Sequence, residues 1–268
     1  MHLKFTPQGL LIYVTMAAFL LAAILLKTQR KALGRGFWFA GFAVATAAVV
    51  YRGFHTGHPP MQNLFEFFLC MAAFLWPLSL LSRYQTGSDT DFQDALLGLI
   101  ILFPSGFVLS EEPRALPPAL QSPLFIPHVG SYVAAYIILA RSAFMALPLF
   151  KSAGPLTPSD PHYLELSRAD AVSRQTAAMG FVLMTIGLFL GSIWGKICWG
   201  HYWQWDPKET WSLATWFMYA AYFHCRLKTG LRHPRLLAIL LWIGFLFVIL
   251  TLTWINVSKL FSGMHTYA

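Results

Sequence analysis

The chain has 268 residues, of which 57% are hydrophobic, 16% are aromatic and only 11% are charged. A soluble domain carries about 25% charged residues, so this chain has too few polar side chains to cover a soluble globule. The composition predicts an all-α, polytopic membrane protein. The net charge of +8 does not require a nucleic-acid partner, because Lys and Arg also concentrate in cytoplasmic loops, and we expect none.

The cysteines exclude two kinds of redox or haem site. Cys70, Cys198 and Cys225 are scattered, and the sequence contains neither a CxxC pair nor a CxxCH segment. The chain therefore carries neither a thioredoxin-like dithiol nor a c-type haem attachment site of its own.

Apolar runs divide the sequence into candidate membrane spans. A bilayer core about 30 Å thick requires about 20 apolar residues in a helix, and about eight such runs predict a helix bundle that forms one integral domain over residues 1–268. The fourth run, which contains Pro104, and the seventh are short, so either could be tilted, kinked or partly re-entrant. The loop from Lys151 to Arg174 is expected to be a short amphipathic or irregular linker. The runs are Gly9–Leu26, Phe37–Phe54, Leu64–Leu81, Ala95–Leu109, Ile126–Phe150, Ala177–Cys198, Trp211–Cys225 and Leu236–Val257.

The distribution of Lys and Arg predicts the orientation. The loops after the first, third, fifth and seventh runs hold 12 of these residues, and the opposite side holds 6. Because cytoplasmic loops are enriched in positive residues, the first set is predicted to be cytoplasmic. Both termini, and the loop between the sixth and seventh runs, are then expected on the outer side.

That outer loop is unusually rich in Trp. The segment 194–216, WGKICWGHYWQWDPKETWSLATW, holds six of them. Indole rings favour the membrane interface, which suits Trp194, Trp211 and Trp216 near the ends of runs. It suits Trp203 and Trp205 less well, because they lie inside the loop, where aromatic faces could instead stack on a large planar ligand. Both explanations stay open.

Charged residues accompany these rings. Asp206 precedes Pro207, so its carboxylate is expected to cap the next helix at least as readily as it takes a chemical role. Lys196 and Lys208 flank the loop and could meet an anionic edge of a bound ligand, although exposed lysines are usually solvated.

The stretch WGHYWQWDPKETWSL resembles the tryptophan-rich WWD motif, WGxxWxWDxKExWSL, of the haem-handling cytochrome c assembly proteins. GHPPMQNLFEF (57–67), His128, His224 and the tail NVSKLFSGMHTYA also resemble landmarks of that family, and in particular of its CcsA (ResC) subfamily. The fixed motif positions are matched by Trp199, Gly200, Trp203, Trp205, Asp206, Lys208, Glu209, Trp211, Ser212 and Leu213.

The resemblance implies a haem site on the outer side of a bacterial inner membrane. Haem b would be bracketed by His128 and His265, with the Trp-rich loop against the porphyrin. His224 would be one ligand of a second, intramembrane haem site whose other histidine belongs to a CcsB/ResB-like membrane partner. The expected haem-binding residues are His128, His265, His224, Trp199, Trp203, Trp205, Asp206 and Trp211, of which the three histidines are the iron ligands.

The resemblance also implies a reaction. The chain would act with its CcsB/ResB-like partner as a holocytochrome c synthase, or haem lyase, that joins haem vinyl groups to the two thiols of CxxCH in apocytochrome c. A thioredoxin-like protein would keep those thiols reduced. No residue of this chain is expected to be a catalytic acid or base, because positioning supplies most of the effect.

The histidine positions are informative without the resemblance. His128 stands at the outer start of a run and His265 in the outer tail, where neither is an obvious core residue, and His commonly holds haem iron. His224 lies inside a run, where an ionisable group is costly, although it could reach the inner interface. The roles of four further residues stay open, with a structural role favoured for Glu66: His55, His58, Glu66 and Arg141.

Other functions also remain open. A relative in the same superfamily could deliver or export haem, or regulate its synthesis. A di-haem electron-transfer subunit of a quinol enzyme is a second possibility, although such proteins usually pair two histidines on facing spans. A transporter without chemistry is a third.

Overall fold

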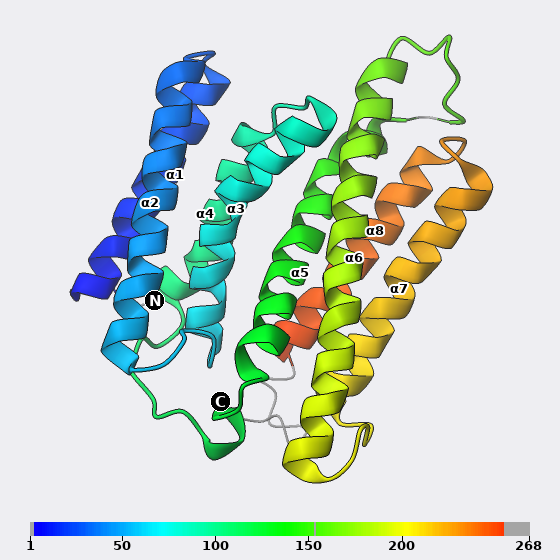
Figure 1. The fold of residues 1–268 in the computed structure, drawn as a ribbon. Coiled ribbons are helices and arrows are strands. Elements are labelled where there is room, and N and C mark those ends of the chain that lie inside the picture. The colour runs from blue at the N-terminus through cyan, green and yellow to red at the C-terminus, as the bar shows by residue number, and fades with distance from the viewer. Residues whose placement is uncertain (1–2, 153, 255–268) are drawn as a thin grey trace. The chain divides into compact units, whose positions relative to one another are not determined.

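The computed structural model describes residues 3–152 and 154–254, which form α-helices, short helical turns and no strands (Figure 1). The chain divides into two compact units, residues 1–126 and 127–268. Unit 1 contains α1 (Pro7–Lys27), α2 (Lys31–Thr56), α3 (Leu64–Thr86), α4 (Asp91–Phe107) and η1 (Pro118–Leu120). Unit 2 contains α5 (Phe125–Met145, whose first two residues precede the division), η2 (Leu147–Lys151), α6 (Tyr163–Trp199), α7 (Pro207–Thr229), α8 (Pro234–Ile249) and the π-helical turn η3 (Leu250–Trp254).

Unit 1 packs around α1, which contacts α2 and α4, while α3 contacts the same two helices. Phe19 of α1 is fully buried and fits where two glycines leave room. A Cβ at Gly41 of α2 would lie 2.5 Å from the Phe19 ring, and one at Gly98 of α4 would lie 2.7 Å from it. Trp38 packs on the same ring at a centroid distance of 4.6 Å. Close approach of these helices therefore depends on small residues facing one large ring.

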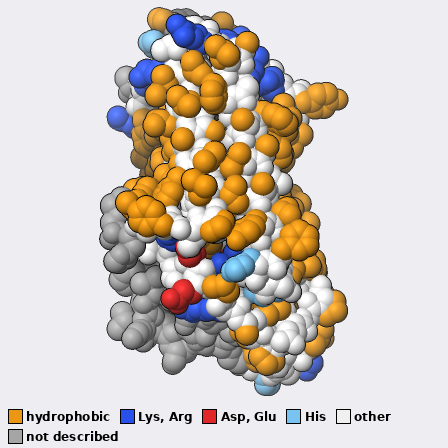
Figure 2. All heavy atoms as spheres, turned by 90° about the vertical axis from the view of Figure 1, so that its left-hand side faces the viewer, with side chains coloured by type: hydrophobic (Ala, Val, Ile, Leu, Met, Phe, Trp, Pro, Cys, Tyr) orange, Lys and Arg blue, Asp and Glu red, His pale blue; other side chains and the backbone are white. Residues whose placement is uncertain are grey.

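The outward face of α1 and α2 has the surface of a membrane protein. Apolar side chains run along its length, and Lys and Arg gather at one end (Figure 2). The α1–α2 connection carries three exposed basic residues, Lys27, Arg30 and Lys31. The large apolar residues exposed on the two helices include Leu10, Leu20, Ile24, Phe39 and Phe54.

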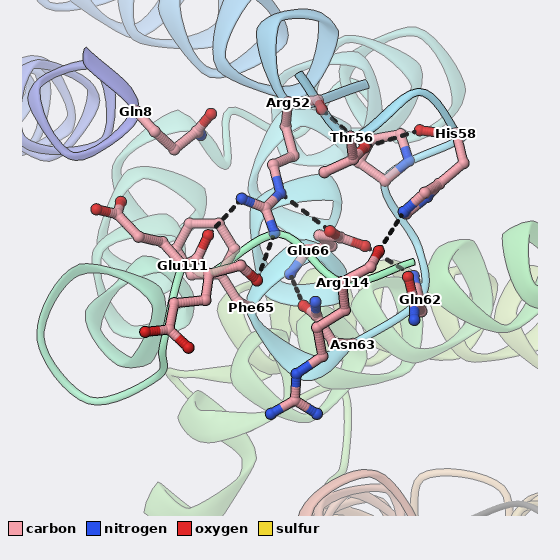
Figure 3. A network of polar contacts seen from close by, with 12 residues as sticks. Gln8, Arg52, Thr56, His58, Gln62, Asn63, Phe65, Glu66, Glu111 and Arg114 are labelled. Carbon is pink, nitrogen blue, oxygen red and sulfur yellow. Dashed lines mark hydrogen bonds and ion pairs between the residues drawn. The ribbon is translucent and has the colours of Figure 1, made fainter. Parts of the chain in front are cut away.

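A buried ion pair fixes the opposite end of unit 1. Arg52 Nε donates to Glu66 Oε1 at 3.0 Å, and both side chains are almost completely buried. The Arg52 guanidinium also donates to the backbone carbonyls of Glu111 and Glu112, and it lies over the Phe65 ring (Figure 3). Arg52 thereby joins α2 to α3 and holds the segment that follows α4.

Unit 2 also has polar pairs that join its helices. Arg141 of α5 is buried and donates to Thr176 Oγ1 of α6 at 3.1 Å. Near the start of α6, the buried Asp170 accepts two hydrogen bonds from Arg226 of α7, at 3.1 and 2.8 Å. The bidentate pair ties α6 to the C-terminal end of α7.

The prediction of an all-α membrane bundle with about eight helices is confirmed. Among the described residues, six helical segments are long and apolar enough to cross a membrane: α1, α2, α3, α5 with η2, α6, and α8 extended to Thr253. α4 has 17 residues, and α7 carries several charged side chains. The expectation of a single domain over 1–268 stays a prediction, as does the orientation.

Several helices extend beyond the predicted apolar runs, and α6 extends furthest. α6 begins at Tyr163 rather than Ala177, so within the described part of the expected linker only residues 152 and 154–162 are irregular. The 37 residues of α6 span about 55 Å, which is longer than a bilayer core of about 30 Å. The first turns of α6 are polar and lie outside its apolar run. α7 has 23 residues rather than the short run predicted, because it begins at Pro207, before Trp211, and ends at Thr229, after Cys225.

Candidate functional site

His128 lies in the first turn of α5, where its ring is held by α6. Its Nδ1 is 2.9 Å from the carbonyl oxygen of Gly187. A carbonyl can only accept, so Nδ1 carries a proton, and in the neutral imidazole the lone pair is then on Nε2. A histidine that binds a metal through one ring nitrogen usually donates a hydrogen bond from the other nitrogen to a carbonyl or carboxylate. That hydrogen bond fixes the tautomer and the ring orientation.

One indole lies beside this imidazole, and a second indole packs on the first. The Trp194 ring meets the His128 ring at a centroid distance of 5.2 Å and an angle of 64°. Trp194 is only 2% exposed, so it packs within the unit. Trp199 follows at 6.2 Å from Trp194, tilted by 30°. The structure thus brings His128 together with the first two rings of the Trp-rich segment.

The loop after α6 turns sharply and presents a second pair of rings. Gly200 ends α6 with φ of +84°, a conformation that glycine adopts without strain. Trp203 and Trp205 then meet edge to face at 5.8 Å. Trp205 has φ of +59° and is 69% exposed. A bulky residue with positive φ is a strained outlier that typically marks a functional segment.

Asp206 and Glu209 cap α7 reciprocally, as the sequence indicated for Asp206. Asp206 Oδ1 accepts from the backbone N–H of Lys208 at 2.9 Å. Glu209 Oε2 accepts from the N–H groups of Gln204 and Asp206, at 2.8 and 3.2 Å. The two carboxylates therefore fix the loop against the start of α7.

Two lysines lie near this loop in different states. Lys196 is exposed, donates to the Gly200 carbonyl at 2.8 Å and lies over the Tyr202 ring. Burial lowers the pKa of the Lys208 ammonium to about 8, an effect that the neighbouring Asp206 carboxylate opposes. A half-buried cation of this kind would be stabilised by an additional anion nearby.

The last two tryptophans of the segment pack against helices. Trp211 meets Phe247 of α8 edge to face at 5.6 Å. Trp216 donates from Nε1 to Thr185 Oγ1 of α6 at 2.9 Å and packs on Phe181. These contacts stabilise the α6–α7–α8 packing below the loop.

Two of the three histidines expected to bind iron lie within the described residues, and they are far apart. His224 is exposed on α7, 17 residues or about 25 Å of helix from Pro207. It lies two residues from Arg226, whose partner Asp170 is 21 residues, or about 30 Å of helix, from Gly191 beside His128. His128 and His224 therefore cannot share one iron. His265 lies outside the described residues.

Residues of unit 1 that the sequence left open have structural partners. Glu66 pairs with Arg52 and also accepts from the backbone N–H of Gln62. The two ring nitrogens of His58 contact the carbonyls of Pro59 and Arg114, whereas His55 is exposed and stacks on Tyr51. Within residues 3–152 and 154–254, no three His, Cys, Asp or Glu residues gather as a metal site. A haem iron needs only two axial ligands.

Sequence reasoning missed the role of α6 beside His128. Gly187 supplies the carbonyl that His128 contacts, and Gly191 lies against its ring. The only signal in the sequence is the spacing of glycines along one face of the sixth run, and it does not reveal which side chain they meet.

The helices and this site define a multi-pass helical membrane protein in which a histidine at the start of α5 packs against a Trp-rich segment. Residues 61–265 match the family described as cytochrome C assembly protein, and the chain belongs to that family. It is 31% identical over 261 residues to the cytochrome c biogenesis protein CcsA of Prochlorococcus marinus (strain MIT 9313), covering 84% of this chain and 80% of the relative. It is 30% identical to the CcsA proteins of Synechococcus sp. (strain CC9902), over 83% of this chain and 82% of the relative, and of Mesostigma viride, over 96% and 93%.

Proposed function

We propose that this chain holds haem b on the outer side of the bacterial cytoplasmic membrane and presents it for thioether attachment to the CxxCH segment of apocytochrome c. Membership of the cytochrome c assembly family supports a role in cytochrome c biogenesis. The observation that carries the finer proposal is the hydrogen bond from His128 Nδ1 to the Gly187 carbonyl, because it makes Nε2 the nitrogen that can bind iron, on a ring packed against Trp194.

The residues of the Trp-rich segment suit a large, flat, mostly apolar substrate with an anionic edge. Aromatic faces bury extensive ring surface and exclude water. We assign the porphyrin contacts to Trp199, Trp203, Trp205 and Trp211, with Asp206 holding the loop through its cap. Lys208, whose pKa is lowered by burial, is the proposed contact for a propionate.

His128 and His265 are the proposed axial ligands of this outer site. The assignment of His265 rests on the family resemblance. His128 supplies Nε2 in a fixed orientation, and the histidine of the incoming CxxCH segment displaces one of the two ligands. We further propose that His224 binds a second haem together with a histidine of a CcsB/ResB-like subunit, which its exposed position on α7 permits.

The attachment itself is an addition. Each cysteine sulfur bonds to one carbon of a vinyl group, the C=C bond becomes single, and the thiol hydrogen passes to the other vinyl carbon. No net electrons are transferred, so the thiols must arrive reduced, and a thioredoxin-like protein is the proposed reductant. The chain positions the reacting groups and excludes water from them, and these two effects supply much of the rate enhancement in such reactions. It acts as a haem lyase only within the complex.

The test is purification of the complex carrying His128→Ala or His265→Ala, followed by its visible absorption spectrum and an assay of cytochrome c assembly. Each variant should lose haem from the outer site, and exogenous imidazole should partly restore both haem and assembly. His201→Ala is the matched control, because His201 is exposed in the same loop at a variable motif position.

Intact haem binding and assembly in both histidine variants would overturn the proposal. Haem binding that depends on His128 without any thioether formation would instead favour haem delivery or export within the same superfamily. A reversible redox spectrum that turns over quinol would favour an electron-transfer subunit.

A further inference from the structure

Helices α5 and α6 meet in an antiparallel register in which glycines of α6 face larger residues of α5. A Cβ at Gly180 would lie 2.7 Å from Leu139, one at Gly187 would lie 2.8 Å from Tyr132, and one at Gly191 would lie 2.5 Å from His128 Cε1. Each of these separations is shorter than real Cβ atoms show. The side chains of α5 therefore sit directly on the backbone of α6.

At His128, this contact has a consequence beyond close packing. The Gly187 carbonyl would normally accept only the N–H of residue 191, four residues on, but its oxygen has two lone pairs and can also accept from His128 Nδ1. Side chains on a helix point toward its N-terminus, so a side chain at 191 would cover the turn that contains this carbonyl. Without a Cβ at 191, the imidazole reaches it.

The ring of His128 is thus held on several sides. Gly191 lies against its Cε1–Nδ1 edge, Gly187 accepts from Nδ1, and Tyr132 and Trp194 meet it edge-on at 5.3 and 5.2 Å. Tyr132 is itself seated on Gly187, with Ser131 alongside. Four residues on two helices consequently determine both the tautomer and the direction of Nε2.

We propose that Gly191 and Gly187 are positioning residues for His128, and that they aim its Nε2 at the haem iron. This inference rests on the proposed function, because it assumes that His128 binds iron. Outer hydrogen-bond partners of metal-ligating histidines typically change metal affinity by about 10- to 100-fold when they are lost. A Cβ at 191 would break that hydrogen bond and rotate the ring, without changing the ligand itself.

The experiment compares Gly191→Ala with Gly180→Ala in the purified complex with its partner subunit. The two substitutions add the same atom to the same face of α6 against a comparable contact, but Gly180 meets Leu139 rather than the histidine. Haem b is titrated into each variant and followed by visible absorption, with and without exogenous imidazole. We expect Gly191→Ala to weaken haem binding by about 10- to 100-fold and to lose the bis-histidine spectrum, both partly restored by imidazole. Gly180→Ala should bind haem as the natural protein does.

Gly187→Ala gives an intermediate case. Its Cβ would press on Tyr132 while the carbonyl stays available, so we expect a smaller loss of affinity with the bis-histidine spectrum retained.

The outcomes separate this inference from the proposed function. If His128→Ala keeps its haem, the proposed function fails, and the inference fails with it. If His128→Ala loses haem while Gly191→Ala matches Gly180→Ala, only the inference is overturned.

A folding defect in Gly191→Ala is addressed by the double variant His128→Ala with Gly191→Ala. Removing the imidazole removes the three atoms nearest to the new Cβ, so the double variant should be recovered from membranes in the same yield as His128→Ala, with no additional loss of haem. A yield as poor as that of Gly191→Ala alone would mean that the glycine serves helix packing only, which would overturn the inference.

Discussion

The Glu209 carboxylate accepts a hydrogen bond from the backbone N–H of Asp206, while Asp206 accepts from Lys208 at the start of the same helix. This reciprocal capping box joins the Trp-rich loop to α7. Asp206 can therefore be required for assembly without touching haem. The alternative is that its negative charge acts directly on a ligand.

Asp206→Ala and Asp206→Asn distinguish these roles. Asn is as good an N-cap as Asp, whereas Ala at that position costs about 0.5–2 kcal/mol of stability. We expect Asp206→Asn to keep both the thermal midpoint in detergent and cytochrome c assembly, and Asp206→Ala to lower both. A stable Asp206→Asn variant that fails to assemble cytochrome c would show that the charge itself is needed.

We expect replacement of Trp205 to affect protein stability and haem binding in opposite directions. Its φ of +59° is costly for a bulky residue, and its side chain is 69% exposed, so burial in the unit offsets little of the strain. Strain of this kind amounts to about 1–3 kcal/mol. Trp205→Gly should therefore keep or raise the thermal midpoint of the haem-free protein while lowering its haem affinity. Loss of stability together with unchanged haem binding would contradict a ligand-facing role for this indole.

The fold could be predicted well where apolar run and helix coincide. The first three predicted runs lie within α1 to α3, because each helix is apolar along most of its length. The start of α6 could not be predicted, since Tyr163 to Gln175 carry charges that suggest a loop. One of them, Asp170, is buried against Arg226 from another helix, and that pairing is invisible to any local pattern.

The site could be predicted only in part, for the same reason. His128 stood out because a histidine at the start of an apolar run is unusual, and Asp206 because it precedes Pro207. The contribution of Gly187 and Gly191 depends on the register between α5 and α6. A glycine in an apolar run carries no mark of the side chain that it will meet.

We expect loss of the Arg52–Glu66 ion pair to lower the stability of unit 1 by a large amount. Both groups are buried and fully engaged, and removing one partner of such a pair leaves a buried charge, which costs about 3–5 kcal/mol. Glu66→Ala should markedly lower the thermal midpoint in detergent. Glu112→Ala is the control, since its side chain is exposed and only its backbone contacts Arg52; exposed substitutions usually change stability by less than about 0.5 kcal/mol. Equal midpoints for the two variants would show that the pair contributes little.

His224 provides a prediction that depends on the partner subunit. The side chain is exposed on α7, so replacing it removes little packing within this chain. His224→Ala should leave the thermal midpoint of the isolated chain within the range of an exposed substitution, about 0.5 kcal/mol. In the complex, the same variant should lose one haem from the absorption spectrum while the haem that depends on His128 remains.

Lys228→Ala is the matched control, because Lys228 is exposed one turn further along α7 and is not a proposed haem ligand. It should retain both haems. If His224→Ala destabilised the isolated chain, the histidine would be a structural residue of unit 2. If the complex kept both haems, the intramembrane site would have to use another ligand. Asp170, which pairs with Arg226 near His224, and Gly191, which lies beside His128, are about 30 Å apart along α6. His224→Ala and His128→Ala should therefore deplete different haems independently.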